Sequence, residues 1–284
     1  MTMDRREFIK KTGLGLAGLM VLPEIKQGSA SEAFEDGYGV LYDATACIGC
    51  RECEIACKGQ RGISPQFKNE LDADTWTIIK LYQDPQIGST YSFIKRNCMH
   101  CIDPACVSAC PVGAMQKTAE GPVIYDETIC IGCRYCMAAC PFDVPKYEWE
   151  TVFPRVQKCD LCADRLSEGL QPACVEACRI GALKFGKRSD LLAEAHDRIN
   201  NNPEKYVNAV YGENEVGGTS VMYLSKIPFE ELGLPVLGSS SLPSLTWPWM
   251  KAVPGLAVVV AGLMTVLYWV TGRKLKIQVQ EEEK

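Results

Sequence analysis

The sequence predicts an α+β fold that ends in a single transmembrane helix. Three observations support this prediction. All sixteen cysteines lie between Cys47 and Cys178, in four groups of four. Short strand-like stretches alternate with short helix-like stretches around these groups. A run of twenty uncharged residues, 252–271, follows near the C-terminus.

Composition restricts the functional class. The chain has 284 residues, which is enough for one or two domains, and carries a net charge of −5. Nucleic-acid-binding domains concentrate basic residues on one face, so this acidic balance indicates no nucleic acid as partner. With His100 and His196 as the only two histidines, a His-rich zinc, copper or haem site is not favoured.

The N-terminus has the parts of an export signal in their usual order. The stretch DRREFIK is followed by an apolar run at 13–22 and by small residues at 28–30. Paired arginines of this kind are typical of the twin-arginine route, which exports folded proteins. We therefore expect residues 1–30 to be a twin-arginine signal peptide, cleaved after Ala30 or retained. The alternative is a basic N-terminus on an ordinary amphipathic helix.

The uncharged run near the C-terminus is long enough to span a bilayer. At 1.5 Å per residue, twenty helical residues reach about 30 Å, the thickness of the hydrocarbon core. Aromatic residues flank or end the run, and basic residues follow at once: Trp247, Trp249, Tyr268 and Trp269, then Arg273, Lys274 and Lys276. The positive-inside rule then predicts a transmembrane helix at 247–272 and a cytoplasmic tail at 273–284. The rest of the chain would lie on the periplasmic side of the inner membrane, and a buried core helix is the weaker alternative.

The cysteines repeat with regular spacing and none is left over. The four groups are Cys47, Cys50, Cys53 and Cys57; Cys98, Cys101, Cys106 and Cys110; Cys130, Cys133, Cys136 and Cys140; and Cys159, Cys162, Cys174 and Cys178. The third group, with Pro141 after it, is the complete C-x2-C-x2-C-x3-C-P run of bacterial ferredoxins. In such a run three thiolates bind one [4Fe–4S] cubane, while the fourth reaches the neighbouring cluster. Gly49 and Gly132 would let backbone N–H groups approach the sulfurs.

Two other uses of cysteine fit less well. Zinc sites pair two separated C-x2-C knuckles and do not need the third and fourth cysteines of each group, although a zinc-bound structural scaffold remains the alternative of another class. Disulfides fail because four cysteines within eleven residues cannot all pair without strain.

The groups also repeat as pairs. CIGCRECEIAC is echoed by CIGCRYCMAAC, and DPACVSACPVGAM by QPACVEACRIGAL, which indicates duplication of a two-cluster unit. A hairpin is predicted from 114–117 and 123–126 around the turn Glu120-Gly121-Pro122, and a matching strand at 183–185. The fold class is therefore tandem bacterial 2[4Fe–4S] ferredoxin-like domains, with the four-cluster domain at 38–187.

The residues after this domain carry weaker signals. They hold a charged helix at 189–200, a Gly-rich loop at 212–218 and a Pro/Ser-rich stretch. We expect 188–246 to be a partner-facing extension and linker, with plain surface structure as the alternative.

These motifs together resemble a known family. The leader, KRNCMHCIDPACVSACPVGAM, CRYCMAACPFDVPKYEW, KCDLC, YGENEVGGTSVMYLSKIP and one C-terminal span are similar to the periplasmic iron–sulfur electron-transfer subunits of hydrogenase-2 type. These subunits are related to the β subunits of formate dehydrogenase and DMSO reductase, which serve molybdopterin enzymes. The resemblance covers nearly the whole chain.

The resemblance implies how the cysteines share four [4Fe–4S] clusters, because in this family groups one and four serve one pair of clusters and groups two and three the other. The implied sets are Cys47, Cys50, Cys53 and Cys178 for cluster 1; Cys159, Cys162, Cys174 and Cys57 for cluster 2; Cys98, Cys101, Cys106 and Cys140 for cluster 3; and Cys130, Cys133, Cys136 and Cys110 for cluster 4. The chain departs from the family at Arg179, where a proline is frequent, and we expect this to alter local geometry or raise that cluster's potential without removing the cluster. His100 is expected to support or pack beside a cluster rather than bind iron.

The resemblance also implies a function. Electrons would pass between a periplasmic nickel–iron hydrogenase and a quinone-reactive integral membrane subunit, and the chain itself would not be catalytic. The sequence indeed contains no convincing phosphate loop, Ser/His/Asp order or carboxylate pair. The alternative is the same role for a formate dehydrogenase or another respiratory reductase.

Overall fold

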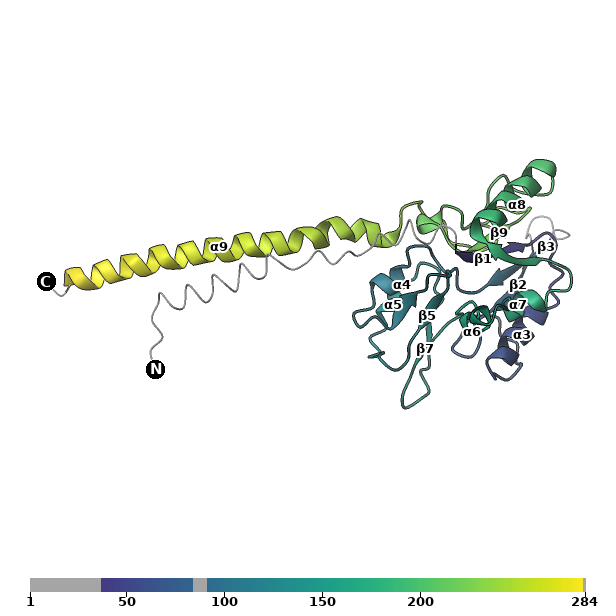
Figure 1. Cartoon of the computed structure of the whole chain (residues 1–284), viewed down its shortest axis with the longest axis horizontal. Helices are drawn as coiled ribbons and strands as arrows, with labels where there is room; N and C mark the ends of the chain where they lie inside the picture. The colour runs from purple at the N-terminus through teal and green to yellow at the C-terminus, as the bar shows by residue number, and fades with distance from the viewer. Residues whose placement is uncertain (1–36, 84–90, 283–284) are drawn as a thin grey trace.

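The computed structural model describes residues 37–83 and 91–282, with side chains as far as Gly272. It consists of a cysteine-rich α+β domain from which one long helix projects (Figure 1). The expected signal peptide at 1–30 lies outside the described residues.

A three-stranded sheet joins the two ends of the domain. Strand β1 (Tyr38–Asp43) lies in the middle, antiparallel to β8 (Leu183–Lys187) and parallel to β9 (Val221–Leu224). Side chains alternate across the sheet, as the two-residue period of a strand requires. Tyr42 packs with the cysteines on one face, whereas Leu41 belongs to a separate apolar cluster on the other.

Helix α8 (Arg188–Asn201) covers that second face. Leu191, Ala195 and Ile199, spaced four residues apart, form its buried stripe and pack against Leu41 and other sheet residues. The helix predicted at 189–200 is thus confirmed. The segment 188–246 also provides strand β9, whose four residues are all buried, and the short 3-10 helix Glu215–Gly217. Its first part is therefore built into the domain, where we had expected an extension and linker.

The remaining small elements surround the cysteines. Helix α3 packs against α7, and helix α4 packs against α5. Three antiparallel hairpins connect them, and the hairpin predicted between 114 and 126 is one of these. The elements are α3 (Glu52–Gln60), α4 (Ala105–Ser108), α5 (Tyr135–Ala139), α6 (Ala163–Ser167) and α7 (Ala173–Glu176), with strands β2 (Ile78–Gln83), β3 (Tyr91–Arg96), β4 (Met115–Lys117), β5 (Val123–Tyr125), β6 (Lys146–Tyr147) and β7 (Val156–Gln157).

Helix α9 (Leu242–Glu282) projects from the domain (Figure 1). Its first 31 residues, Leu242–Gly272, are long and apolar enough to cross a membrane, and within the described chain nothing buries the most apolar part. A candidate membrane span is therefore present, as predicted. The helix begins beside α4, where the Ser241 hydroxyl donates a 2.6 Å hydrogen bond to Asp103.

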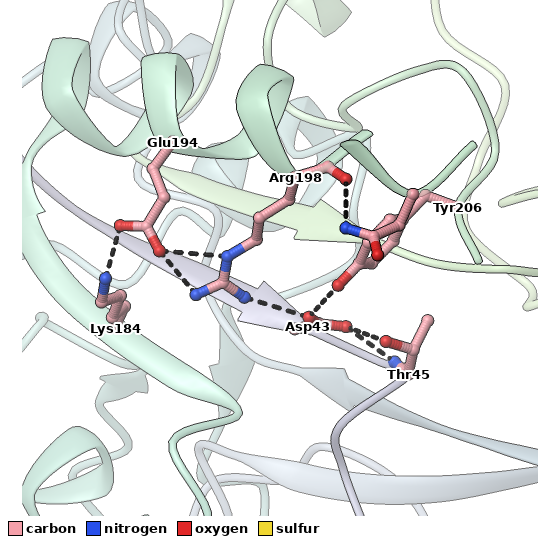
Figure 2. Close-up of polar contacts among 7 residues, drawn as sticks. Asp43, Thr45, Lys184, Glu194, Arg198 and Tyr206 are labelled. Carbon is pink, nitrogen blue, oxygen red and sulfur yellow. Dashed lines mark hydrogen bonds and ion pairs between the residues drawn. The ribbon is translucent and has the colours of Figure 1, made fainter. Parts of the chain in front are cut away.

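A polar network fastens α8 to the sheet (Figure 2). The Asp43 carboxylate at the end of β1 is only 2% exposed. It accepts hydrogen bonds from the Tyr206 hydroxyl at 2.8 Å and from the Arg198 guanidinium at 3.0 Å. Glu194 holds the other side of the guanidinium at 2.6 Å. The buried Asp43 carboxylate is thus fully paired, which is the condition for burying a charge without a large penalty.

Replacing Arg198 by Met should loosen α8, because it leaves a buried carboxylate without its cation. The expected loss of stability is about 2–3 kcal/mol, below that of a fully buried pair because Arg198 reaches solvent. Hydrogen exchange of the α8 amides measures it. Lys184→Met is the matched control: this lysine pairs with Glu194 but is 52% exposed, so about 0.5 kcal/mol or less is expected. Equal effects of the two variants would contradict the assignment.

Candidate metal centre

Cysteines from the first and fourth groups line two neighbouring cavities. We define the first cavity by Cys47, Cys50, Cys53 and Cys178, which line it together with Tyr42 and Ile79. The second cavity is defined by Cys57, Cys159, Cys162 and Cys174, which line it with Lys95 and Trp76. Each cavity therefore takes three cysteines from one group and one from the other.

The second and third groups are likewise brought together. The pKa of Cys101 is raised mainly by burial and then by three nearby thiols, those of Cys98, Cys140 and Cys106. Burial and then the thiols of Cys130, Cys110 and Cys133 contribute to raising the pKa of Cys136 to about 11. Cys140 thus lies among the cysteines of group two, and Cys110 among those of group three.

The four sets of cysteines, numbered as the implied clusters, are neighbours in the order first, second, third and fourth, which we call the line of sets. Beyond burial, Cys174 of the second set acts to raise the pKa of Cys53 in the first. Cys98 of the third set does the same to Cys159 of the second. Cys136 of the fourth set does the same to Cys106 of the third. Each set is therefore an electrostatic neighbour of the next.

Helix packing explains the exchange of cysteines between sets. Cys53 and Cys57 lie four residues apart on α3, and α7 carries Cys174 with Cys178 just beyond its end. Because α3 packs against α7, Cys53 meets Cys178 at one cavity and Cys57 meets Cys174 at the other. Helices α4 and α5 repeat this arrangement for the inner groups.

Backbone N–H groups point at several sulfurs. Gly132 donates to Cys130 Sγ at 3.4 Å, and Leu161 donates to Cys159 Sγ at the same distance. Ala114 donates to Cys110 Sγ at 3.2 Å. Partial burial acts to raise the pKa of Cys110. Four such backbone donors, from Val112 to Met115, outweigh this and lower the pKa. Donors of this kind stabilise thiolates and the clusters that they bind.

Position 49, in the first cysteine loop, requires a glycine because of its backbone conformation and its surroundings. It has φ +71°, and an added Cβ would lie 2.3 Å from the Phe93 ring. Its N–H contributes to stabilising the Cys47 thiolate, against the burial that raises the pKa of Cys47. Gly132 at the equivalent place in the third group has φ +69°. The expected close approach of backbone to sulfur is thus confirmed for both.

Buried polar side chains near the cysteines were not predicted as a group. Lys95 and Lys158 are 2% and 5% exposed, and His100 is fully buried. The Val123 N–H donates to His100 Nδ1 at 2.9 Å, while Nε2 has no partner among the described residues. Burial, and then Lys158 and the other nearby lysines, lower the pKa of His100, so the imidazole is neutral and carries its proton on Nε2. Nothing in sequence separates these lysines from surface ones.

The two arginines before α3 and α5 are equivalent. Arg51 and Arg134 both have φ 62° and ψ 11°. Arg51 pairs with the buried Glu54 carboxylate at 2.8 Å. The Arg134 guanidinium lies over the ring of Trp149, 4.9 Å from its centre, so it packs on an aromatic side chain while the Tyr135 side chain is exposed.

The donor set fits cubane iron–sulfur clusters. Each set offers four thiols, and the described part of the chain holds no group of three or more His, Cys, Asp or Glu side chains arranged for a single metal ion. Four thiolates that bind one zinc ion would lie about 3.8 Å apart, given Zn–S bonds of about 2.3 Å. The described cysteines form no such tight group, which favours a cubane over a single zinc ion. The buried, unpaired N–H of His100 also requires an acceptor, which a cluster sulfur would provide.

Comparisons with known proteins agree with this chemistry. Two models of the 4Fe-4S dicluster domain match residues 46–114 and 89–188. A protein of Nitratidesulfovibrio vulgaris is 44% identical over 99% of this chain and 80% of its own length. Hydrogenase-2 operon protein HybA of Escherichia coli O157:H7 is 37% identical over 84% of this chain and 86% of its own. The formate dehydrogenase-O iron–sulfur subunit of Escherichia coli K12 is 38% identical over 79% and 76%.

Fold and site together define an iron–sulfur protein built from tandem 4Fe-4S dicluster domains. More closely, the chain belongs to the family that contains hydrogenase-2 operon protein HybA and the iron–sulfur subunits of formate dehydrogenases. The family predicted from the sequence motifs is thus confirmed.

Gly49→Ala should disturb the loop that carries Cys47 and Cys50. A side chain at positive φ is strained by about 1–3 kcal/mol, and the Phe93 ring must also move. We expect lower iron and sulfide content per chain. Gly59→Ala is the control, because Gly59 lies inside α3 with nothing within 4 Å of an added Cβ; it should retain full iron content and gain up to about 1 kcal/mol of stability. Equal iron loss in both variants would refute this account.

Proposed function

We propose that the four sets of cysteines bind four [4Fe–4S] clusters. Clusters 1 and 2 would occupy the first and second cavities, with Cys178 and Cys57 as the exchanged ligands. Cys140 and Cys110 would be exchanged in the same way between clusters 3 and 4. The observation that carries this proposal is the shared lining of each cavity by three cysteines of one group and one of another. We also propose the division into a cluster-binding domain at 38–187 and a following segment at 188–246. Helix α8 and strand β9 of this segment pack onto the cluster-binding domain.

Iron analysis tests the proposal against the zinc scaffold. The purified chain should hold about sixteen iron and sixteen acid-labile sulfide, four of each per cubane. Cys178→Ser should change the same cluster signal in electron paramagnetic resonance as Cys47→Ser, because both belong to the first cavity. Cys159→Ser should change a different one. Four zinc ions, or a Cys178→Ser effect confined to the signal that Cys159→Ser changes, would contradict the proposed ligand sets.

We infer that the function is electron transfer between two partner proteins. Iron–sulfur clusters supply one-electron redox chemistry at potentials from about −700 to +450 mV. The line of cysteine sets gives a continuous route through the domain, and each set is an electrostatic neighbour of the next. The protein contributes binding, orientation and electrostatics, while catalysis belongs to a partner.

The end of this line near α9 is proposed to face the membrane partner. Helix α9 starts beside α4, which carries Cys106 of the third set, and α4 packs on α5 of the fourth set. The first set lies at the other end of the line. Electrons would therefore pass between a catalytic partner at the first set and a quinone-reactive membrane subunit at the fourth.

The catalytic partner is proposed to be a nickel–iron hydrogenase, in keeping with the similarity to HybA and with the predicted twin-arginine leader. The formate dehydrogenase subunits are similar over almost as much of the chain, so formate dehydrogenase is the second candidate. Anchoring by 247–272 on the periplasmic side, with the tail at 273–284 in the cytoplasm, completes the proposal.

Membranes from cells that produce or lack the chain distinguish the partners. Hydrogen-dependent quinone reduction should require the full chain, and a version that ends before Leu242 should leave the membrane and lose this activity. Formate-dependent reduction should not change. If only formate-dependent reduction is lost, the hydrogenase assignment is wrong, and co-purification of a molybdopterin subunit would support the second candidate.

A further inference from the structure

Lys95 is a buried cation placed between two sets of cysteines. Its side chain lies in the wall of the second cavity and is 2% exposed. The ammonium donates to Thr77 Oγ1 at 2.6 Å and to Asn97 Oδ1 at 3.0 Å. Among the residues that the structure describes, no carboxylate pairs with it. Both partners are neutral, so the charge of Lys95 is not cancelled by them.

A lone ammonium in a protein interior needs a compensating negative charge. The groups that face Lys95 are mostly thiols: Cys174 and Cys159 of the second cavity and Cys53 of the first. Burial would lower the pKa of Lys95, but these thiols and Tyr223 raise it, so the side chain remains cationic. Thiolates that bind iron therefore provide its counter-charge.

We propose that Lys95 sets the reduction potentials of the two clusters bound in the first and second cavities, holding them above the values they would have without this charge. This inference rests on the proposed ligand sets. A fixed positive charge stabilises the reduced, more negative form of a cluster, and in a buried site it is poorly screened. The effect should be largest in the second cavity, whose wall contains Lys95, and small at the third and fourth sets.

Strand position gives a matched control. Lys80 is an exposed lysine on β2, the strand paired with the β3 strand that carries Lys95. Lys95→Met and Lys80→Met each remove one positive charge and put the same unbranched side chain in its place. Lys95→Arg keeps the charge. Asn97→Asp is nearly isosteric and places a carboxylate beside the ammonium, which cancels its charge without deleting the lysine.

The test is a redox titration of the full-length chain followed by electron paramagnetic resonance. Lys95→Met should lower at least one midpoint potential by about 59 mV or more, the one-electron equivalent of a tenfold change in the equilibrium constant. Lys95→Arg and Lys80→Met should leave all the potentials at their wild-type values. Asn97→Asp should lower the same potential as Lys95→Met.

The inference is overturned if Lys95→Met retains about sixteen iron and all its potentials stay unchanged. Should Lys95→Met fail to retain its clusters, Asn97→Asp decides: an unchanged potential refutes the role of the charge and a lowered one supports it. Failure of the proposed function looks different, because the wild-type chain would then lack the iron and the four one-electron transitions.

Discussion

The structure depends on one constraint: the paired helices α3 and α7 each present two cysteines to two different sites. Cys53 and Cys57 on α3 line different cavities, and so do Cys174 on α7 and Cys178 just beyond its end. Neither cavity is complete unless the two helices lie against each other. On the proposed ligand sets, helix packing that would otherwise rely on apolar area is tied to metal–ligand bonds, which contribute folding free energy directly. This explains how helices of only four or five residues serve as structural elements.

The same constraint nests one pair of cysteine sets inside the other. The sequence repeats as two consecutive units, and the two dicluster models match consecutive, overlapping stretches. In space, however, group one meets group four and group two meets group three. The sheet follows this nesting, since β1 before the first group pairs with β8 after the last. A buried carboxylate at the end of β1 then holds α8 over the sheet.

Short-range chemistry made much of this predictable. The cysteine spacings predicted the metal chemistry. Turn residues predicted the hairpin at 114–126, and the local sequence pattern predicted the helix at 189–200. The role of 188–246 was not predictable, because β9 has the composition of any short apolar strand and joins the sheet through long-range pairing. Lys95 was missed for a similar reason, because burial of a polar side chain is set by tertiary packing. His100 was expected beside a cluster, but only the structure shows its hydrogen-bond partner.

The nested arrangement also bears on export. The first and second cavities need Cys47 to Cys57 together with Cys159 to Cys178, so neither can form until almost the whole domain has been synthesised. On the proposed ligand sets, cluster insertion and folding would then finish together, after the last group has emerged. A chain exported unfolded would expose sixteen thiols to an oxidising compartment, where disulfides form. The twin-arginine route, which carries folded proteins, removes this conflict. If the leader predicted at 1–30 directs export, the nested cysteines therefore require that the domain be assembled before it crosses the membrane.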